Sequence, residues 1–127
     1  MISKSIQQII IKQLDNEIKD IELIILFGSA TNDDYIQYKS DNDIAFLSSS
    51  TVSNLQRWDA KEKLASLLNS DIDLVDLRSS DDVFRFEITS KGKNLFIKPP
   101  SKIEQFLDSV YINYIQLNEY RAEVMEA

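Results

Sequence analysis

The sequence predicts a mixed α/β fold, in which a small mixed β-sheet is flanked by helices and a long helix follows at the C-terminal end. Short apolar runs typical of strands interchange with longer segments whose apolar residues recur at helical spacing. Their order is helix, strand, strand, helix, strand, helix, strand, helix, which is typical of a sheet covered by helices. With 127 residues and a hydrophobic fraction of 43%, the chain is expected to form one domain, residues 1–127.

The N-terminal third is predicted to hold one helix and one strand. Apolar residues recur at helical spacing through the first twenty residues, as in an amphipathic helix. The run "IELIILF", residues 21–27, is short, β-branched and apolar like a buried strand, and Gly28 and Ser29 end it. The polar segment 31–39 has no clear period and is expected to be a loop. The first helix is expected to bury Ile6, Ile9, Ile10, Leu14 and Ile18.

Two more strands are predicted on either side of a second helix. "DIAFL", residues 43–47, has the pattern of a strand, and the cluster "SSSTVSN" after it offers N-cap residues for a helix. "DIDLVDL", residues 71–77, alternates as a third strand does. The helix between these strands is expected to turn Trp58, Leu64, Leu67 and Leu68 inward.

The C-terminal part is predicted to hold a helix, a short strand and a second, longer helix. "SSDDVFRFEITSKGK", residues 79–93, has acidic residues in its first turn and Gly92 near its end, as a capped helix does. "NLFIK", residues 94–98, is expected to be an edge strand, because two prolines stop it. A last helix is expected from Ser101 to about Glu123.

The last helix is apolar on more than one side. One stripe alternates by four and three residues and suits a core; it consists of Ile103, Leu107, Val110, Tyr114, Leu117 and Val124. Further apolar residues lie off this stripe, which indicates either a wider core contact or a contact with a partner. The residues proposed for a partner interface are Tyr111, Ile115 and Tyr120.

The composition excludes several classes of chemistry. The chain has no histidine and no cysteine, so serine–histidine and cysteine–histidine nucleophiles are excluded, and a divalent metal would be held by oxygen atoms. Its net charge of −7 argues against direct binding of nucleic acid, which depends on lysine and arginine. Neither a signal peptide nor a membrane span is recognisable, so a cytoplasmic location is expected.

The stretch from Gly28 to Asp43 combines a turn with paired carboxylates. A glycine directly after a buried strand lets the backbone approach a ligand closely, and the amides and the Ser29 hydroxyl of such a turn can bind phosphate oxygens. Asp41 and Asp43 are two residues apart at the start of a strand, so both would point to one side. Two such carboxylates repel each other unless a cation lies between them.

A third carboxylate is available from the strand 71–77. Asp73 would reach the same site if this strand lies beside the strand 43–47, and it shares a face with Asp71. Asp76 lies on the opposite face and is held in reserve, because a shift of one residue in register would exchange the two faces. The choice between Asp73 and Asp76 stays open at this point.

Together these motifs resemble the nucleotidyltransferase superfamily of DNA polymerase beta, whose signature is Gly-Ser followed by Asp-x-Asp. Eleven residues separate Ser29 from Asp41 here, which fits that signature. The likeness is greatest to the minimal nucleotidyltransferases of HEPN toxin–antitoxin pairs. It extends through "SDNDIAFL", "DIDLVDL" and "FRFEITSKGKNLFIK" to the last helix, so it covers nearly the whole chain.

The resemblance implies a function for each of these residues. An acceptor hydroxyl would attack the α-phosphorus of ATP, and two Mg²⁺ ions would neutralise the charge that develops. Asp41 and Asp43 would ligate both ions, and Asp73 would hold the ion at the acceptor. Gly28 and Ser29 would position the β- and γ-phosphates. The acceptor that the family implies is a tyrosine of a cognate HEPN RNase toxin, which adenylylation neutralises within a hetero-oligomer.

One departure from the family keeps other functions open. Many members follow Gly-Ser with an arginine and a glycine, whereas this chain has "GSATNDD". An alternative is therefore an antitoxin with weak or no catalysis that acts by direct binding. A further alternative is a transferase for a small molecule such as an aminoglycoside, although such enzymes usually carry a second domain. A calcium site of the EF-hand type is disfavoured because the loop lacks its ligand pattern.

Overall fold

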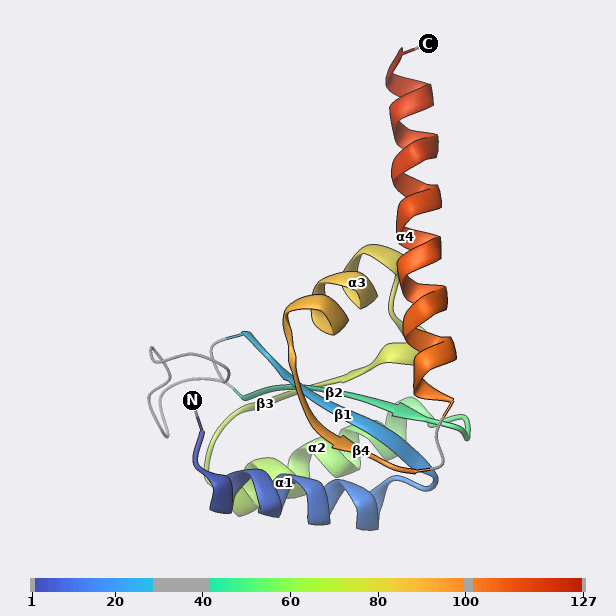
Figure 1. Ribbon diagram of the computed structural model, residues 1–127. Helices are drawn as coiled ribbons and strands as arrows, with labels where there is room; N and C mark the ends of the chain where they lie inside the picture. The colour runs from blue at the N-terminus through green and yellow to red at the C-terminus, as the bar shows by residue number, and fades with distance from the viewer. Residues whose placement is uncertain (1, 29–41, 100–101, 127) are drawn as a thin grey trace.

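The computed structural model of the chain describes residues 2–28, 42–99 and 102–126 (Figure 1). The predicted order of helices and strands is confirmed, with one short 3₁₀ helix, η2, added after the third strand. The elements are α1 (Lys4–Glu17), β1 (Ile21–Phe27), β2 (Asn42–Ser48), α2 (Asn54–Leu68), β3 (Ile72–Asp76), η2 (Leu77–Ser79), α3 (Asp82–Lys91), β4 (Lys93–Ile97) and α4 (Ile103–Glu126).

The four strands form one mixed sheet in the order β3-β2-β1-β4. β1 is antiparallel to both β2 and β4, whereas β2 and β3 are parallel. The parallel pair requires a crossover, and α2 provides it. β4 is an edge strand, as its flanking prolines predict.

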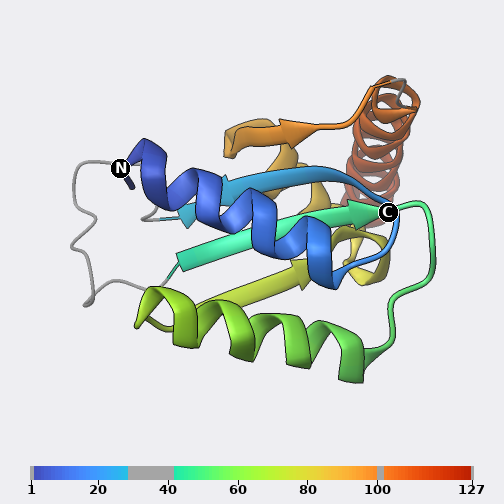
Figure 2. The ribbon, with the colours of Figure 1, turned by 90° about the horizontal axis from the view of Figure 1, so that it is seen from below.

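Helices cover both faces of the sheet. α1 and α2 lie side by side across one face, and α3 and the first turns of α4 lie on the other (Figures 1 and 2). Side chains alternate along the strands, so β1, β2 and β3 each supply two cores. The α1–α2 core includes Ile24, Ile44, Phe46 and Leu74. The α3–α4 core includes Leu23, Ile25, Ala45, Ile88 and Ile103.

Side-chain caps explain where three of the helices begin. Ser3 accepts a hydrogen bond from the Ile6 amide at the start of α1, and Asp81 accepts one from the Phe84 amide at the start of α3. At α2, Ser53 and Gln56 form a reciprocal capping box. Each cap satisfies amides that have no partner inside the helix, so polar residues of the predicted breaks set the helix boundaries.

Three residues of α1 and α2 that were expected in the core are exposed. On α2, Trp58 and Leu67 are 51% and 57% exposed, while Ala60 and Leu64 are buried. Trp58 lies six residues before Leu64, which places it about 120° away around the helix. The large aromatic side chain therefore lies outside the core, and the small Ala60 marks the packed side of α2. Ile9 of α1 is also exposed, at 37%.

α4 departs from its prediction at both ends. Its first residue is Ile103 and its last is Glu126, rather than Ser101 and Glu123, and Ser101 lies outside the described residues. Ile103 and Val110 of the predicted stripe are buried, but Val124 is 55% exposed. The reason is visible in Figure 1, where the C-terminal half of α4 extends beyond α3 and the sheet. Within the described ranges, no helix has the length and apolar character needed to cross a membrane.

The packed side of α2 can be tested with two leucines of the same helix. Leu64→Ala is expected to lower the free energy of unfolding by about 2–4 kcal/mol, because it leaves a cavity in the α1–α2 core. Leu67→Ala is the matched control and is expected to change it by less than about 0.5 kcal/mol. Urea titrations followed by circular dichroism measure both, and equal losses would contradict the orientation of α2.

Candidate active site

Asp43 and Asp73 lie next to each other on neighbouring strands. β2 and β3 are parallel, and their register sets Asp43 opposite Asp73. Residues in register on adjacent strands point to the same face and are separated by about 5 Å between strand axes. That face is the one that carries Ala45 and Val75 toward α3. The structure therefore brings together two carboxylates that are thirty residues apart in the sequence.

Asp43 also adjoins the turn at the end of β1. Phe27, the last residue of β1, is in register with Asp43, so Gly28 follows directly beside that carboxylate. Gly28 has a φ of +65°, in the left-handed region. A Cβ at Gly28 would collide with the Asp43 carboxylate oxygen and would lie 3.2 Å from its Cγ. Both the backbone conformation and the close approach therefore require glycine here.

The reserve carboxylate, Asp76, belongs to a different environment. It is in register with Phe46 and lies on the face of β3 that carries Leu74, opposite to that of Asp73. Its carboxylate accepts a hydrogen bond of 3.0 Å from the Arg78 amide and so caps η2. The structure places Asp73, and not Asp76, on the same face as Asp43.

The remaining residues expected at the site, Ser29 and Asp41, lie outside the described residues. In the described part of the chain, no group of three or more aspartate, glutamate, histidine or cysteine side chains is arranged to hold a metal. Asp43 and Asp73 supply two carboxylates on one face. Their oxygen donors suit a hard divalent cation such as Mg²⁺, and histidine and cysteine are absent from the whole sequence.

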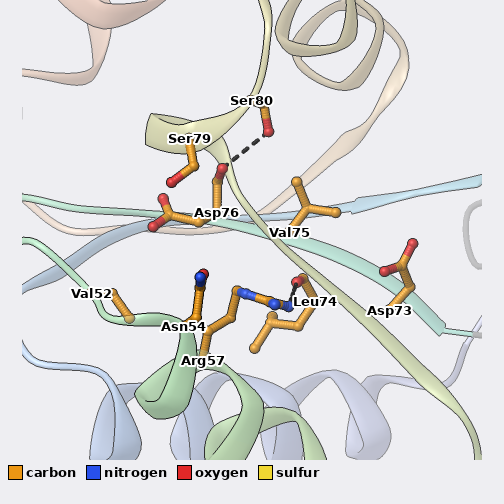
Figure 3. A pocket seen from close by; sticks show the side chains of 9 residues that line it. All are labelled: Val52, Asn54, Arg57, Asp73, Leu74, Val75, Asp76, Ser79 and Ser80. Atoms are coloured by element: carbon orange, nitrogen blue, oxygen red, sulfur yellow. Dashed lines mark hydrogen bonds between the residues drawn. The ribbon is translucent and has the colours of Figure 1, made fainter.

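A hollow of about 310 Å³ adjoins this site along the free edge of β3. Figure 3 shows Asp73 and Asp76 toward opposite ends of it, with Arg57 of α2 between them. Arg57 donates a hydrogen bond of 3.0 Å to the Leu74 carbonyl and so closes part of the strand edge. The sequence pattern did not single out Arg57. A signal was present, because a helix that connects two parallel strands packs back against them.

Lys93 brings a positive charge to the same end of the sheet. It is the first residue of β4 and is in register with Leu26, two residues before Gly28. Leu26 packs in the α1–α2 core, so the Lys93 side chain leaves the sheet on the face opposite to Asp43 and Asp73.

Comparison with known proteins gives matches in both sequence and structure. The sequence pattern of the family described as "Polymerase beta, Nucleotidyltransferase" matches residues 8–101. The protein adenylyltransferase MntA of Shewanella oneidensis is 46% identical over 88 residues, which are 68% of this chain and 62% of that protein. The aligned region thus spans less than two thirds of that curated relative.

Solved structures extend the similarity over most of the chain. A tri-AMPylated Shewanella oneidensis HEPN toxin in complex with MNT antitoxin contains a chain that is 36% identical, with a TM-score of 0.80 over 97% of this chain and 95% of that one. A toxin–antitoxin structure with AMP-PNP gives 37% identity and a TM-score of 0.83, covering 94% and 95%.

The contact between Gly28 and Asp43 predicts a coupling between the two residues. Gly28→Ala is expected to destabilise the fold by more than the roughly 1–2 kcal/mol that a left-handed backbone costs a residue with a Cβ, because a clash is added. In an Asp43→Ala background the clash is absent. Gly28→Ala should then lower the free energy of unfolding only by the cost of the left-handed backbone. Denaturant unfolding of the four proteins measures the difference, and equal costs in both backgrounds would refute the contact.

Proposed function

The chain belongs to the polymerase beta nucleotidyltransferase family, and on that premise we propose that it transfers AMP from ATP to a tyrosine of a HEPN-domain RNase toxin. The modification neutralises the toxin, so the protein acts as its antitoxin. The observation that carries the proposal is the register of Asp43 with Asp73 beside Gly28. The names of the relatives, an adenylyltransferase and an antitoxin bound to an AMPylated HEPN toxin, support the choice of acceptor.

The proposed reaction needs little covalent help from the protein. The tyrosine oxygen attacks the α-phosphorus of ATP, the bond to the β-phosphate oxygen breaks, and pyrophosphate leaves while the tyrosine proton passes to solvent. Such transfers depend on in-line positioning and on neutralisation of charge. Bound Mg²⁺, proposed as two ions, would supply the positive charge at the attacking and leaving oxygens.

The residues of this chain would hold and orient the reactants. Asp43 and Asp73 would ligate the cation from adjacent strands, with Asp41 as the further ligand implied by the family signature. Asp73 would face the acceptor, because its strand lies at the open edge of the sheet. The backbone at Gly28, with Ser29, would receive the β- and γ-phosphates. We propose that residues 1–127 form one minimal nucleotidyltransferase domain that works in the cytoplasm, where ATP is available.

The partner would be held by α4. Tyr111 and Tyr120 are 55% and 64% exposed, and Ile112 is also exposed, at 52%. The Tyr111 ring lies 6.3 Å from that of Phe86, so the N-terminal end of this surface is anchored to α3. Ile115 is half-buried and contributes less free surface than expected. Tyr111 and Tyr120 are nine residues apart and so lie on opposite sides of α4, each as an exposed aromatic side chain of the kind that is enriched in protein interfaces.

A contact antitoxin is the second candidate. The sequence "GSATNDD" after β1 favours it, since the arginine and glycine common in the family are missing there. Such a protein would silence the toxin through α4 alone, and the carboxylates would not matter for neutralisation.

The carboxylates separate the two candidates. Asp43→Asn and Asp73→Asn are each expected to lower the rate of AMP transfer by at least about 100-fold, because each removes a charged ligand of the proposed Mg²⁺, which would neutralise the charge of the transition state. Asp76→Asn is the matched control and should keep the rate, since asparagine still caps η2. Intact-mass spectrometry of the toxin after incubation with ATP and Mg²⁺ measures the transfer. Full neutralisation by both asparagine variants would instead establish the contact antitoxin.

The proposed interface is tested with a variant of α4. Tyr120→Ala is expected to weaken the complex with the toxin about 10-fold, because it removes an exposed aromatic anchor, and to leave the unfolding free energy nearly unchanged. Asn118→Ala, on the same stretch of helix, is the control and should change neither quantity. Calorimetric titration with the toxin measures the affinity. Unchanged binding by the Tyr120 variant would place the interface elsewhere.

A further inference from the structure

A second hollow lies at the other end of the sheet and is strongly basic. It has a volume of about 420 Å³, and the end of β2, η2, α3 and the start of α4 border it. The end of β2 and the start of α4 lie at the right-hand end of the sheet in Figure 1, whereas β2 begins at the left. Its polar and aromatic lining includes Glu22, Ser49, Arg78, Arg85, Lys102 and Phe106.

Main-chain carbonyls hold two of its three cations in place. Arg78 donates through Nη2 to the Ser48 carbonyl at 2.8 Å. Arg85 donates through Nε to the Leu77 carbonyl at 2.6 Å and through Nη2 to the Arg78 carbonyl. A guanidinium group carries five N–H donors, so each arginine keeps donors beyond these bonds. The two positive charges are therefore positioned before any ligand arrives.

The charge of this hollow is not balanced by its lining. Arg78, Arg85 and Lys102 face a single lining carboxylate, that of Glu22. The carboxylate of Asp82 approaches Arg85, but only to 3.9 Å. Like charges gathered in one concavity raise its potential and attract anions. This excess of positive charge occurs in a chain whose net charge is −7.

We propose that this hollow is a binding site for a nucleoside monophosphate, separate from the transfer site. Arg78, Arg85 and Lys102 would bind the phosphate, since fixed guanidinium groups match its oxygens. The ring of Phe106 offers an apolar surface to the base, and the Glu22 carboxylate offers an acceptor to ribose hydroxyls.

The site is too far from Asp43 to be part of the transfer site. Six residue steps of β2 separate Asp43 from Ser49, or about 20 Å in an extended strand. A mononucleotide at one end of the sheet therefore cannot touch the other end. The inference does not depend on AMP transfer, and it can hold or fail by itself.

The test is titration of the ¹⁵N-labelled full chain with 5′-AMP in EDTA, followed by amide chemical shifts. We expect saturable shifts at Ser49, Arg78 and Phe106 and none at Gly28 or Asp43. Inorganic phosphate should bind the same residues at least 10-fold more weakly, and adenosine should not saturate. Lys102→Glu is expected to weaken AMP binding at least 10-fold, and Arg78→Lys to weaken it less. Lys12→Glu, an exposed lysine of α1, is the charge-matched control.

Three outcomes would overturn the proposal. Shifts confined to Gly28 and Asp43 would show that AMP binds only at the transfer site. Equal affinities in Lys102→Glu and Lys12→Glu would show a general charge effect. Phosphate and AMP binding equally well would reduce the site to an anion site without a nucleoside part. An Asp43→Asn variant should bind AMP at the basic hollow as the unmodified chain does, so a failed transfer assay leaves this result unaffected.

Discussion

The pairing of β2 with both of its neighbours is the constraint on which the rest of the structure depends. Its antiparallel register with β1 sets Asp43 against the turn at Gly28, and its parallel register with β3 sets Asp43 against Asp73. Two carboxylates in adjacent positions repel each other. The sheet tolerates them because they lie at its end, where Asp73 is exposed, and not among the buried side chains of its centre. A cation bound between the two carboxylates is the simplest group that would replace this repulsion with attraction.

The sequence predicts the strands well because each is a short apolar run between polar breaks. It also predicts that Asp73 and Asp76 lie on opposite faces of β3, but not which of the two shares a face with Asp43. It could not predict strand order, so the proximity of Asp43 and Asp73 remained conditional until the parallel register was known. The predicted orientation of α2 was wrong for a different reason. Trp58 was expected in the core, whereas burial depends on which side of the helix faces the sheet.

The two ends of the sheet differ in charge. Carboxylates gather where β2 begins, and arginine and lysine gather where it ends, with a hydrophobic layer between them. The spacing of the carboxylates in the sequence predicts the first of these groups. It does not predict the basic group, because Arg78, Arg85 and Lys102 come from η2, α3 and the residue before α4, and no local pattern links them. Only the fold brings these residues to one hollow.

The projecting α4 has a kinetic consequence for the proposed reaction. Its 24 residues span about 36 Å, so an acceptor bound along it stays attached while its modified segment leaves the carboxylates and returns. While the acceptor stays bound to α4, each later encounter of its modified segment with the carboxylates is intramolecular. For short, flexible connections, the effective concentration of that segment is in the millimolar range. Successive additions to one acceptor molecule would then outpace exchange between molecules. The length of one helix would thus determine whether modification is distributive or processive.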